Sequence, residues 1–280
     1  MAKRYEGQLL GYDDTEIFYQ TWEPSETRGV IVVTHGMAEH SECYHEFAEE
    51  ISNDGWMVVG WDLRGHGRSG GKRGYVADFS DYISDLEKTV SHILTEQSGG
   101  GQPLVLLGHS LGGLITTLFY LKNQTKEVKA LCLSSPALGL AIKVPKFKDT
   151  LARLAADWMP TLTLYNEIKY SDLVRDEAKQ KAYSHDPLRH DKISPAVFLG
   201  MLAGFDTAMQ GAKSIQIPLL LQHSGDDRIV SPDAAKKFFE KVGSDQKKII
   251  VYKDSLHEIF NDLDRTEAIS DLREFLRRIK

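Results

Sequence analysis

Short apolar runs, each about the length of one strand, alternate with segments of helical apolar spacing along this 280-residue chain. Continuous runs of β-branched residues and leucine suit strands that are buried on both faces, as in a parallel sheet. Each run ends near a turn signal that contains glycine, serine or aspartate. The runs occupy residues 30–33, 57–61, 104–107, 130–134, 218–222 and 249–252.

Helical spacing lies between these runs and after the last of them, over residues 81–94, 111–121, 234–242 and 264–279. Strands that alternate with helices predict an α/β fold, with a mostly parallel sheet flanked by helices. The first apolar segments, near Leu9 and at residues 17–19, fit an antiparallel hairpin that starts the sheet.

Residues 139–211 break this alternation, because they contain no convincing strand run. The stretch is also too long for an ordinary connection between two elements. We therefore predict a helical insertion over 139–211, set into a core made of residues 1–138 and 212–280. The alternative is that the stretch simply continues the helices of the core.

Composition narrows the class of protein. The chain has 34 Lys and Arg against 40 Asp and Glu, a net charge of −6, which gives no support to general nucleic-acid binding. Its two cysteines, Cys43 and Cys132, make neither a disulfide framework nor a four-ligand zinc site. No apolar run approaches a membrane span, and no apolar segment follows the basic N-terminal residues. We expect a cytoplasmic protein, with peripheral membrane contact left open.

The sharpest chemical signal is Gly108-His109-Ser110-Leu111-Gly112, which matches the pattern G-x-S-x-G. The motif directly follows an expected strand and directly precedes an expected helix, so it places a serine on a tight strand-to-helix turn. We predict Ser110 as a nucleophile. The alternatives are a plain glycine-rich connection or a phosphate-binding turn, although the spacing fits neither G-x-G-x-x-G nor a P-loop.

A serine hydroxyl needs a general base, and the base needs an orienting acid. His257 lies just after the last strand run and is the candidate base. Asp226 and Asp227 both follow the run at 218–222, and either could supply the acid. These positions all fall at the carboxyl ends of expected strands, where open α/β sheets place their sites. The alternative for His257 is an ordinary loop histidine.

The turn after the first long run supplies the remaining candidates. A His35-Gly36 turn can aim the next backbone N–H at the serine, so Met37 N–H and Leu111 N–H would form an oxyanion hole. We also expect His35, Gly36 and His109 to border the substrate.

Three segments together resemble the α/β hydrolases, and within them the monoacylglycerol lipase and lysophospholipase group: residues 35–41, 62–69 and 108–113. The resemblance selects Asp227 as the acid, four residues after His223 and three before Val230. One departure stands out. Relatives usually have a basic residue directly before the tyrosine of the first segment, whereas this chain has Cys43 before Tyr44.

The resemblance implies a serine hydrolase that cleaves a small lipid ester, monoacylglycerol or lysophospholipid, through an acyl-enzyme and without metal or cofactor. It also implies that residues 139–211 cap Ser110. An apolar stripe in that cap either touches lipid or packs on the core, with basic residues around it: Phe147, Leu151, Leu154, Ala155 and Trp158, beside Lys143, Lys146, Lys148 and Arg153. Alternatives are a small-molecule carboxylesterase or thioesterase, a peptidase or acyl transferase, and a non-catalytic binding module.

Overall fold

One eight-stranded sheet forms the centre of the computed structural model, which describes residues 2–96, 101–141, 152, 154–155, 158–159 and 161–280. The strand order is β1-β2-β4-β3-β5-β6-β9-β10. The strands are β1 Lys3–Leu10, β2 Glu16–Glu23, β3 Gly29–Thr34, β4 Trp56–Trp61, β5 Leu104–His109, β6 Val128–Ser134, β9 Leu219–Ser224 and β10 Lys247–Tyr252.

The strand pairing confirms the predicted sheet. From β4 across to β10 every neighbouring pair is parallel, while β1 pairs antiparallel with β2 and β2 with β4. The expected starting hairpin is therefore present. Thr34 pairs with Gly108 and Gly108 with Leu133, so β3, β5 and β6 end side by side. This edge is where the candidate site residues were expected.

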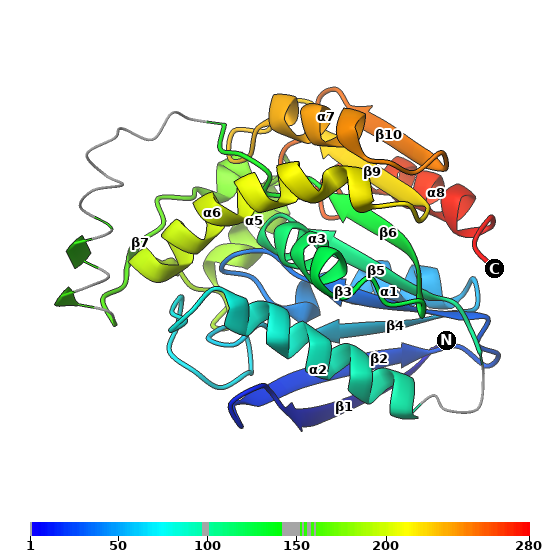
Figure 1. Ribbon diagram of the computed structural model, residues 1–280, viewed down its shortest axis with the longest axis horizontal. Coiled ribbons are helices and arrows are strands. Elements are labelled where there is room, and N and C mark those ends of the chain that lie inside the picture. The colour runs from blue at the N-terminus through cyan, green and yellow to red at the C-terminus, as the bar shows by residue number, and fades with distance from the viewer. Residues whose placement is uncertain (1, 97–100, 142–151, 153, 156–157, 160) are drawn as a thin grey trace.

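Helices cover both faces of the sheet (Figure 1). Consecutive strand residues point to opposite faces, so Val32 and Leu106 join one apolar cluster while Ile31 and Val105 join the other. Burial on both faces explains the continuous apolar runs in the sequence. The helices are α1 His45–Ser52, α2 Ser80–Glu96, α3 Leu111–Asn123, α5 Glu177–Ser184, α6 Pro195–Gly211, α7 Pro232–Lys241 and α8 Arg265–Leu276.

In Figure 1, α2, α3, α6 and α7 lie in front of the sheet. Helices α1 and α8 contribute to the second apolar cluster, on the other face. Helix α1 was not among the predicted helices, although its buried residues Phe47, Ala48 and Ile51 have helical spacing.

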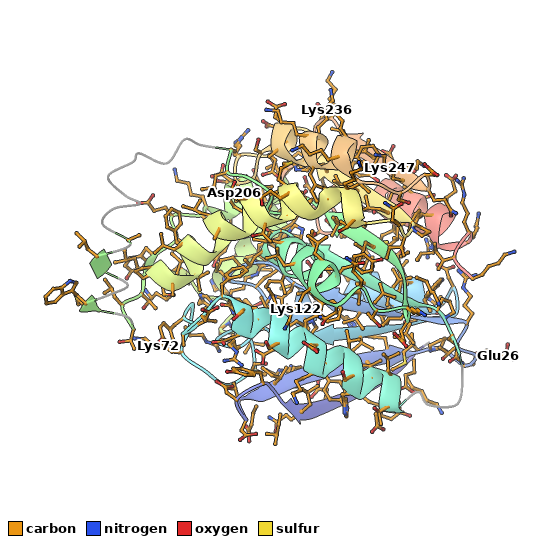
Figure 2. The ribbon with its side chains drawn as sticks, in the orientation of Figure 1. Glu26, Lys72, Lys122, Asp206, Lys236 and Lys247 are labelled. Atoms are coloured by element: carbon orange, nitrogen blue, oxygen red, sulfur yellow. The ribbon has the colours of Figure 1, made fainter. Side chains whose placement is uncertain are left out.

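The predicted insertion, residues 139–211, contains α5 and α6 and also a small antiparallel sheet that we did not predict. Its two strands, β7 Leu164–Tyr165 and β8 Lys192–Ile193, are only two residues long, too short to produce a recognisable apolar run. Lys72, labelled in Figure 2, ties the insertion to the loop after β4 because its ammonium donates to the Thr161 carbonyl oxygen at 2.6 Å.

The apolar stripe of the insertion is described only in part. Leu154 and Trp158 are exposed, with 84% of the surface of Trp158 accessible to solvent. Six residues of the predicted stripe and its basic surround lie outside the described residues: Phe147, Leu151, Lys143, Lys146, Lys148 and Arg153. Within the described ranges, no helix combines the length and the apolar character needed to cross a membrane.

Candidate active site

Ser110 occupies a sharp turn between β5 and α3. Its backbone has φ 49° and ψ −119°, a region that residues other than glycine rarely adopt. The Ser110 N–H donates to the Ser134 carbonyl oxygen at 3.0 Å, and the Ser110 carbonyl oxygen accepts from Gly113, Leu114 and Ala137. A strained conformation held this firmly indicates a functional position.

Glycines allow the turn to pass close to its neighbours. A Cβ atom added at Gly112 would lie 2.1 Å from the Thr34 carbonyl oxygen and 2.4 Å from that of His35. A Cβ added at Gly108 would lie 2.5 Å from the Gly112 carbonyl oxygen. All of these obstacles are backbone atoms, which cannot rotate away as a side chain can. The glycines of the motif are therefore required by packing around the serine.

Replacement of Gly112 by alanine is expected to lower the free energy of unfolding by about 3 kcal/mol, because the new methyl group meets the end of β3. Urea denaturation followed by circular dichroism measures the change. Gly204→Ala is the matched control: its Cβ would meet only flexible leucine side-chain ends of α3, so stability should change by less than about 1 kcal/mol. Equal stability of the two variants would contradict the packing argument.

The structure brings Ser110, His257 and Asp227 into one hydrogen-bonded chain. His257 Nε2 lies 2.8 Å from Ser110 Oγ, and His257 Nδ1 lies 2.8 Å from Asp227 Oδ2. The other carboxylate oxygen, Asp227 Oδ1, accepts the backbone N–H groups of Ile229 and Val230, each at 2.9 Å. These two bonds fix the orientation of the carboxylate toward the histidine.

Asp226, the other candidate acid, lies at the surface of the protein. Its side chain is exposed, and its Oδ2 pairs with the Arg228 guanidinium at 2.8 Å. Of the two adjacent aspartates, only Asp227 contacts His257 in the structure.

Charge and burial set the protonation states of His257 and Asp227. Burial alone would lower the pKa of His257, but the neighbouring Asp227 carboxylate raises it above its ordinary value. Burial alone would raise the pKa of Asp227, but His257 and the hydrogen bonds to the carboxylate lower it. Asp227 is therefore ionised near neutral pH, and His257 is a stronger base than an isolated imidazole.

The two candidate oxyanion donors belong to segments that adjoin Ser110. A Cβ added at Gly36 would lie 3.0 Å from Ser110 Cβ, so the loop after β3 runs directly against the serine. Met37, the next residue, borders the cavity at Ser110, and its N–H has no acceptor among the described residues. Leu111 opens α3, where helix geometry leaves the first N–H groups without an intrahelical acceptor.

A cavity of about 40 Å³ lies at Ser110 and His257. Gly36 and His109, two of the three predicted substrate contacts, border it. The structure does not bring the His35 side chain there. His35 is fully buried, with Nδ1 2.7 Å from the Gly36 carbonyl oxygen and Nε2 accepting the Leu63 N–H at 2.9 Å. The His35 ring therefore stabilises the loop after β3 from inside the protein and does not face the cavity.

The remaining walls come from residues that sequence reasoning did not place there. The insertion supplies Asn166, Ile168, Tyr170, Leu173 and Arg189, and the core supplies Glu39 and Glu258. Nothing local in the sequence indicated that Ile168, Tyr170, Leu173, Arg189, Glu39 and Glu258 would meet here. They become neighbours only because the insertion folds back over the carboxyl ends of the strands.

His40, Cys43 and Asp186 form the nearest group with the atoms of a metal site, which all lie within 4.8 Å of one another. The set fits a cation poorly. The Arg189 guanidinium lies 3.4 Å from Cys43 Sγ, and burial raises the pKa of the Cys43 thiol to about 12. His40 Nε2 is already bonded to Asp186 at 2.8 Å. We interpret the group as a hydrogen-bonded junction between the insertion and the loop after β3.

Comparison with known proteins agrees with this geometry. A family described as Hydrolase_4, serine aminopeptidase S33, matches residues 25–264. The chain belongs to this family. The Hydrolase_4 assignment confirms the α/β-hydrolase fold and the resemblance to the monoacylglycerol lipase and lysophospholipase group.

Several similar proteins of this group carry names from lipid chemistry. The chain is 30% identical over 277 residues to a monoacylglycerol lipase of Mycolicibacterium smegmatis, covering 98% of both chains. It is 30% identical over 256 residues to the phospholipase YtpA of Bacillus subtilis, covering 91% of this chain and 97% of that protein. The crystal structure of Paleococcus ferrophilus monoacylglycerol lipase superposes with a TM-score of 0.82 at 29% identity, covering 98% of both chains.

Proposed function

We propose that the protein is a serine hydrolase of carboxylic esters, with monoacylglycerols or lysophospholipids as its substrates. The observation that carries this proposal is the Ser110–His257–Asp227 chain of hydrogen bonds beside two backbone donors. Relatives that are 30% identical over nearly the whole chain and are named as a monoacylglycerol lipase and a phospholipase support the choice of substrate.

In the proposed mechanism, Ser110 Oγ attacks the ester carbonyl carbon while His257 Nε2 takes the hydroxyl proton. Asp227 holds the imidazole and stabilises its charged form. The negative oxygen of the tetrahedral intermediate accepts from the N–H groups of Met37 and Leu111. His257 then gives its proton to the leaving alcohol. Water, activated by the same histidine, releases the fatty acid from Ser110. The chain's own residues supply every proton transfer.

The proposed function includes a division of the chain into a core and a cap. Residues 1–138 and 212–280 form the hydrolase core, and residues 139–211 form a cap over Ser110. The cap contributes both apolar and polar groups to the cavity, among them Ile168 and Asn166. A glycerol or head group would use the polar groups, and an acyl chain would use the apolar ones. Exposed Trp158 and Met159 lie on the cap and support peripheral contact with lipid.

A small-molecule esterase or thioesterase is the second candidate, and the size of the cavity favours it. A volume of about 40 Å³ has room for only a few water molecules, which is well below the space that a long acyl chain fills. The family description also names an aminopeptidase, so cleavage of amides belongs in the same test.

A hydrolysis series distinguishes these candidates. Purified protein would be assayed on p-nitrophenyl esters from acetate to stearate, on monoacylglycerols, on lysophosphatidylcholines and on aminoacyl p-nitroanilides. We expect kcat/KM on medium- or long-chain glycerol esters to exceed that on acetate by at least about tenfold, because each buried methylene adds binding energy. A maximum at acetate with lipid esters untouched would support the small-molecule esterase instead. Faster cleavage of the anilides would support a peptidase.

A further inference from the structure

Arg189, in the proposed cap, is buried between carboxylates from two separate loops of the core. Its side chain is 3% exposed. The guanidinium lies 3.3 Å from Glu258 Oε1 and 3.9 Å from Glu39 Oε2. The plane of Tyr183 also lies against it, with the guanidinium carbon 3.6 Å from the ring centroid. A charged group so fully buried is stable only where partners hold it, which indicates a specific role.

Glu39 contacts the loop that carries the Met37 N–H, and Glu258 belongs to the loop that carries His257. Glu39 accepts the Gly36 N–H at 2.5 Å and the Tyr44 hydroxyl at 3.0 Å, so it shapes the turn that presents the Met37 N–H. Glu258 directly follows His257.

Glu258 is itself held from two sides. Its Oε2 accepts the Tyr183 hydroxyl at 2.7 Å and the Asn261 amide at 3.0 Å. Its backbone N–H donates to the Leu173 carbonyl oxygen of the cap at 2.9 Å. Arg189 thus connects the loop of the oxyanion donor to the loop of the general base.

We propose that Arg189 is a positioning residue, which holds the Met37 loop and the His257 loop at the separation that acyl transfer requires. This proposal rests on the proposed function. Without the guanidinium, Glu39 and Glu258 would face each other as two buried carboxylates in a region that excludes water. Either the loops separate or a carboxylate takes up a proton, and both changes move the donor relative to the base. A displacement of about 1 Å can cost on the order of 100-fold in rate.

The electrostatics of the pair agree with this geometry. Burial, and then the charge of Glu258, raise the pKa of Glu39. Burial would also raise the pKa of Glu258, but the closer Arg189 guanidinium lowers it below its ordinary value. The Arg189 guanidinium therefore favours the ionised form of Glu258, the carboxylate beside His257.

The side chain of Cys43 lies beside the Arg189 guanidinium. The relatives that the first motif resembles usually have a basic residue at this position, before the tyrosine. Here the position holds a thiol, and Cys43 Sγ lies 3.4 Å from Arg189 Nη2. The short side chain of Cys43 leaves room for the guanidinium that Arg189 brings from the other side. In this chain the positive charge beside position 43 therefore comes from Arg189 of the cap.

The test compares Arg189→Met, Arg189→Lys and the double variant Arg189→Met/Cys43→Arg on p-nitrophenyl acetate and on a monoacylglycerol. The proposed function is tested first: the wild type must hydrolyse these esters, and Ser110→Ala must abolish that activity. The Arg189 variants are compared only after that. Arg273→Met is the matched control, because it also breaks arginine–carboxylate pairs away from the cavity. Arg273 in α8 pairs with Glu50 of α1 and with Asp54 just after α1.

Arg189→Met should lower kcat by about 100-fold on both substrates while KM changes by less than about threefold. Arg189→Lys should recover most of the loss because it keeps the charge. Cys43→Arg in the Arg189→Met background should recover about tenfold. Arg273→Met should keep wild-type kcat. If Arg189→Met does not fold, the double variant Arg189→Met/Glu39→Gln takes its place, because it leaves one buried carboxylate instead of two that face each other. A loss of kcat is still expected, since no cation then joins the two loops.

Three results would overturn the proposal. The first is a kcat within about threefold of wild type when Arg189 is replaced by Met. The second is a loss confined to KM or to one substrate, which would make Arg189 a direct substrate contact. The third is no recovery from Arg189→Lys and none from Cys43→Arg, which would show that the shape of Arg189, and not its charge, matters.

Discussion

Replacement of Ser110 by alanine is expected to lower kcat for ester hydrolysis by on the order of 10⁶, to the level of the blank. The methyl group cannot attack a carbonyl, and the imidazole 2.8 Å from the lost hydroxyl then has no proton to take. The fold should be unchanged, because alanine adds no atoms to the turn. Release of fatty acid measures activity, and thermal unfolding verifies the fold.

Ser135→Ala is the matched control for this substitution. Ser135 is a buried serine directly after the neighbouring strand β6, and it also has a positive φ, 38°. Its hydroxyl accepts the Ser224 N–H at 3.4 Å and has no bond to His257 among the described residues. Activity should therefore stay within about threefold of wild type. Similar turnover in the two variants would exclude Ser110 as the nucleophile.

Asp227→Asn should lower kcat by about 10⁴-fold, because the amide cannot hold the imidazole in the tautomer that accepts the serine proton. It should also change the pH profile. A base must be neutral to act, so activity falls as the pH decreases through the pKa of His257. The Asp227 carboxylate raises that pKa above its ordinary value. Its loss lowers the pKa, and the acid limb of kcat/KM should move to lower pH.

Asp226→Asn is the comparison that the sequence itself provides. Asp226 is the adjacent residue, is exposed, and pairs with Arg228. Exposed pairs of this kind contribute about 0–1 kcal/mol, so kcat and the pH profile should stay close to wild type. A larger loss in Asp226→Asn than in Asp227→Asn would transfer the role of the acid to Asp226.

The sheet was predictable because each of its buried strands is a separate apolar run with a turn signal behind it. Helix α1 was missed because it is short and follows the loop that carries the first motif. Strands β7 and β8 were missed because pairs of two residues leave no periodic pattern. The sequence therefore predicts the core well and the insertion only as a region without a clear strand pattern.

The candidate triad could be predicted because each member follows a strand, and parallel strands bring their carboxyl ends together. The cluster of Arg189, Glu39 and Glu258 could not be predicted, because its contacts join residues up to 150 positions apart in the sequence. The one local signal was the thiol at Cys43 where relatives usually have a basic residue. It marked a departure from the relatives but did not indicate that Arg189 would lie beside the thiol.

The most direct test of the central claim is mass spectrometry of the protein after reaction with an alkyl fluorophosphonate, with and without a competing monoacylglycerol. Such a reagent modifies only a serine that a base and an oxyanion hole activate. We predict one adduct, on the peptide that contains Ser110, formed more slowly when the monoacylglycerol is present. An adduct on another serine, or no adduct under conditions in which the protein hydrolyses esters, would contradict the account.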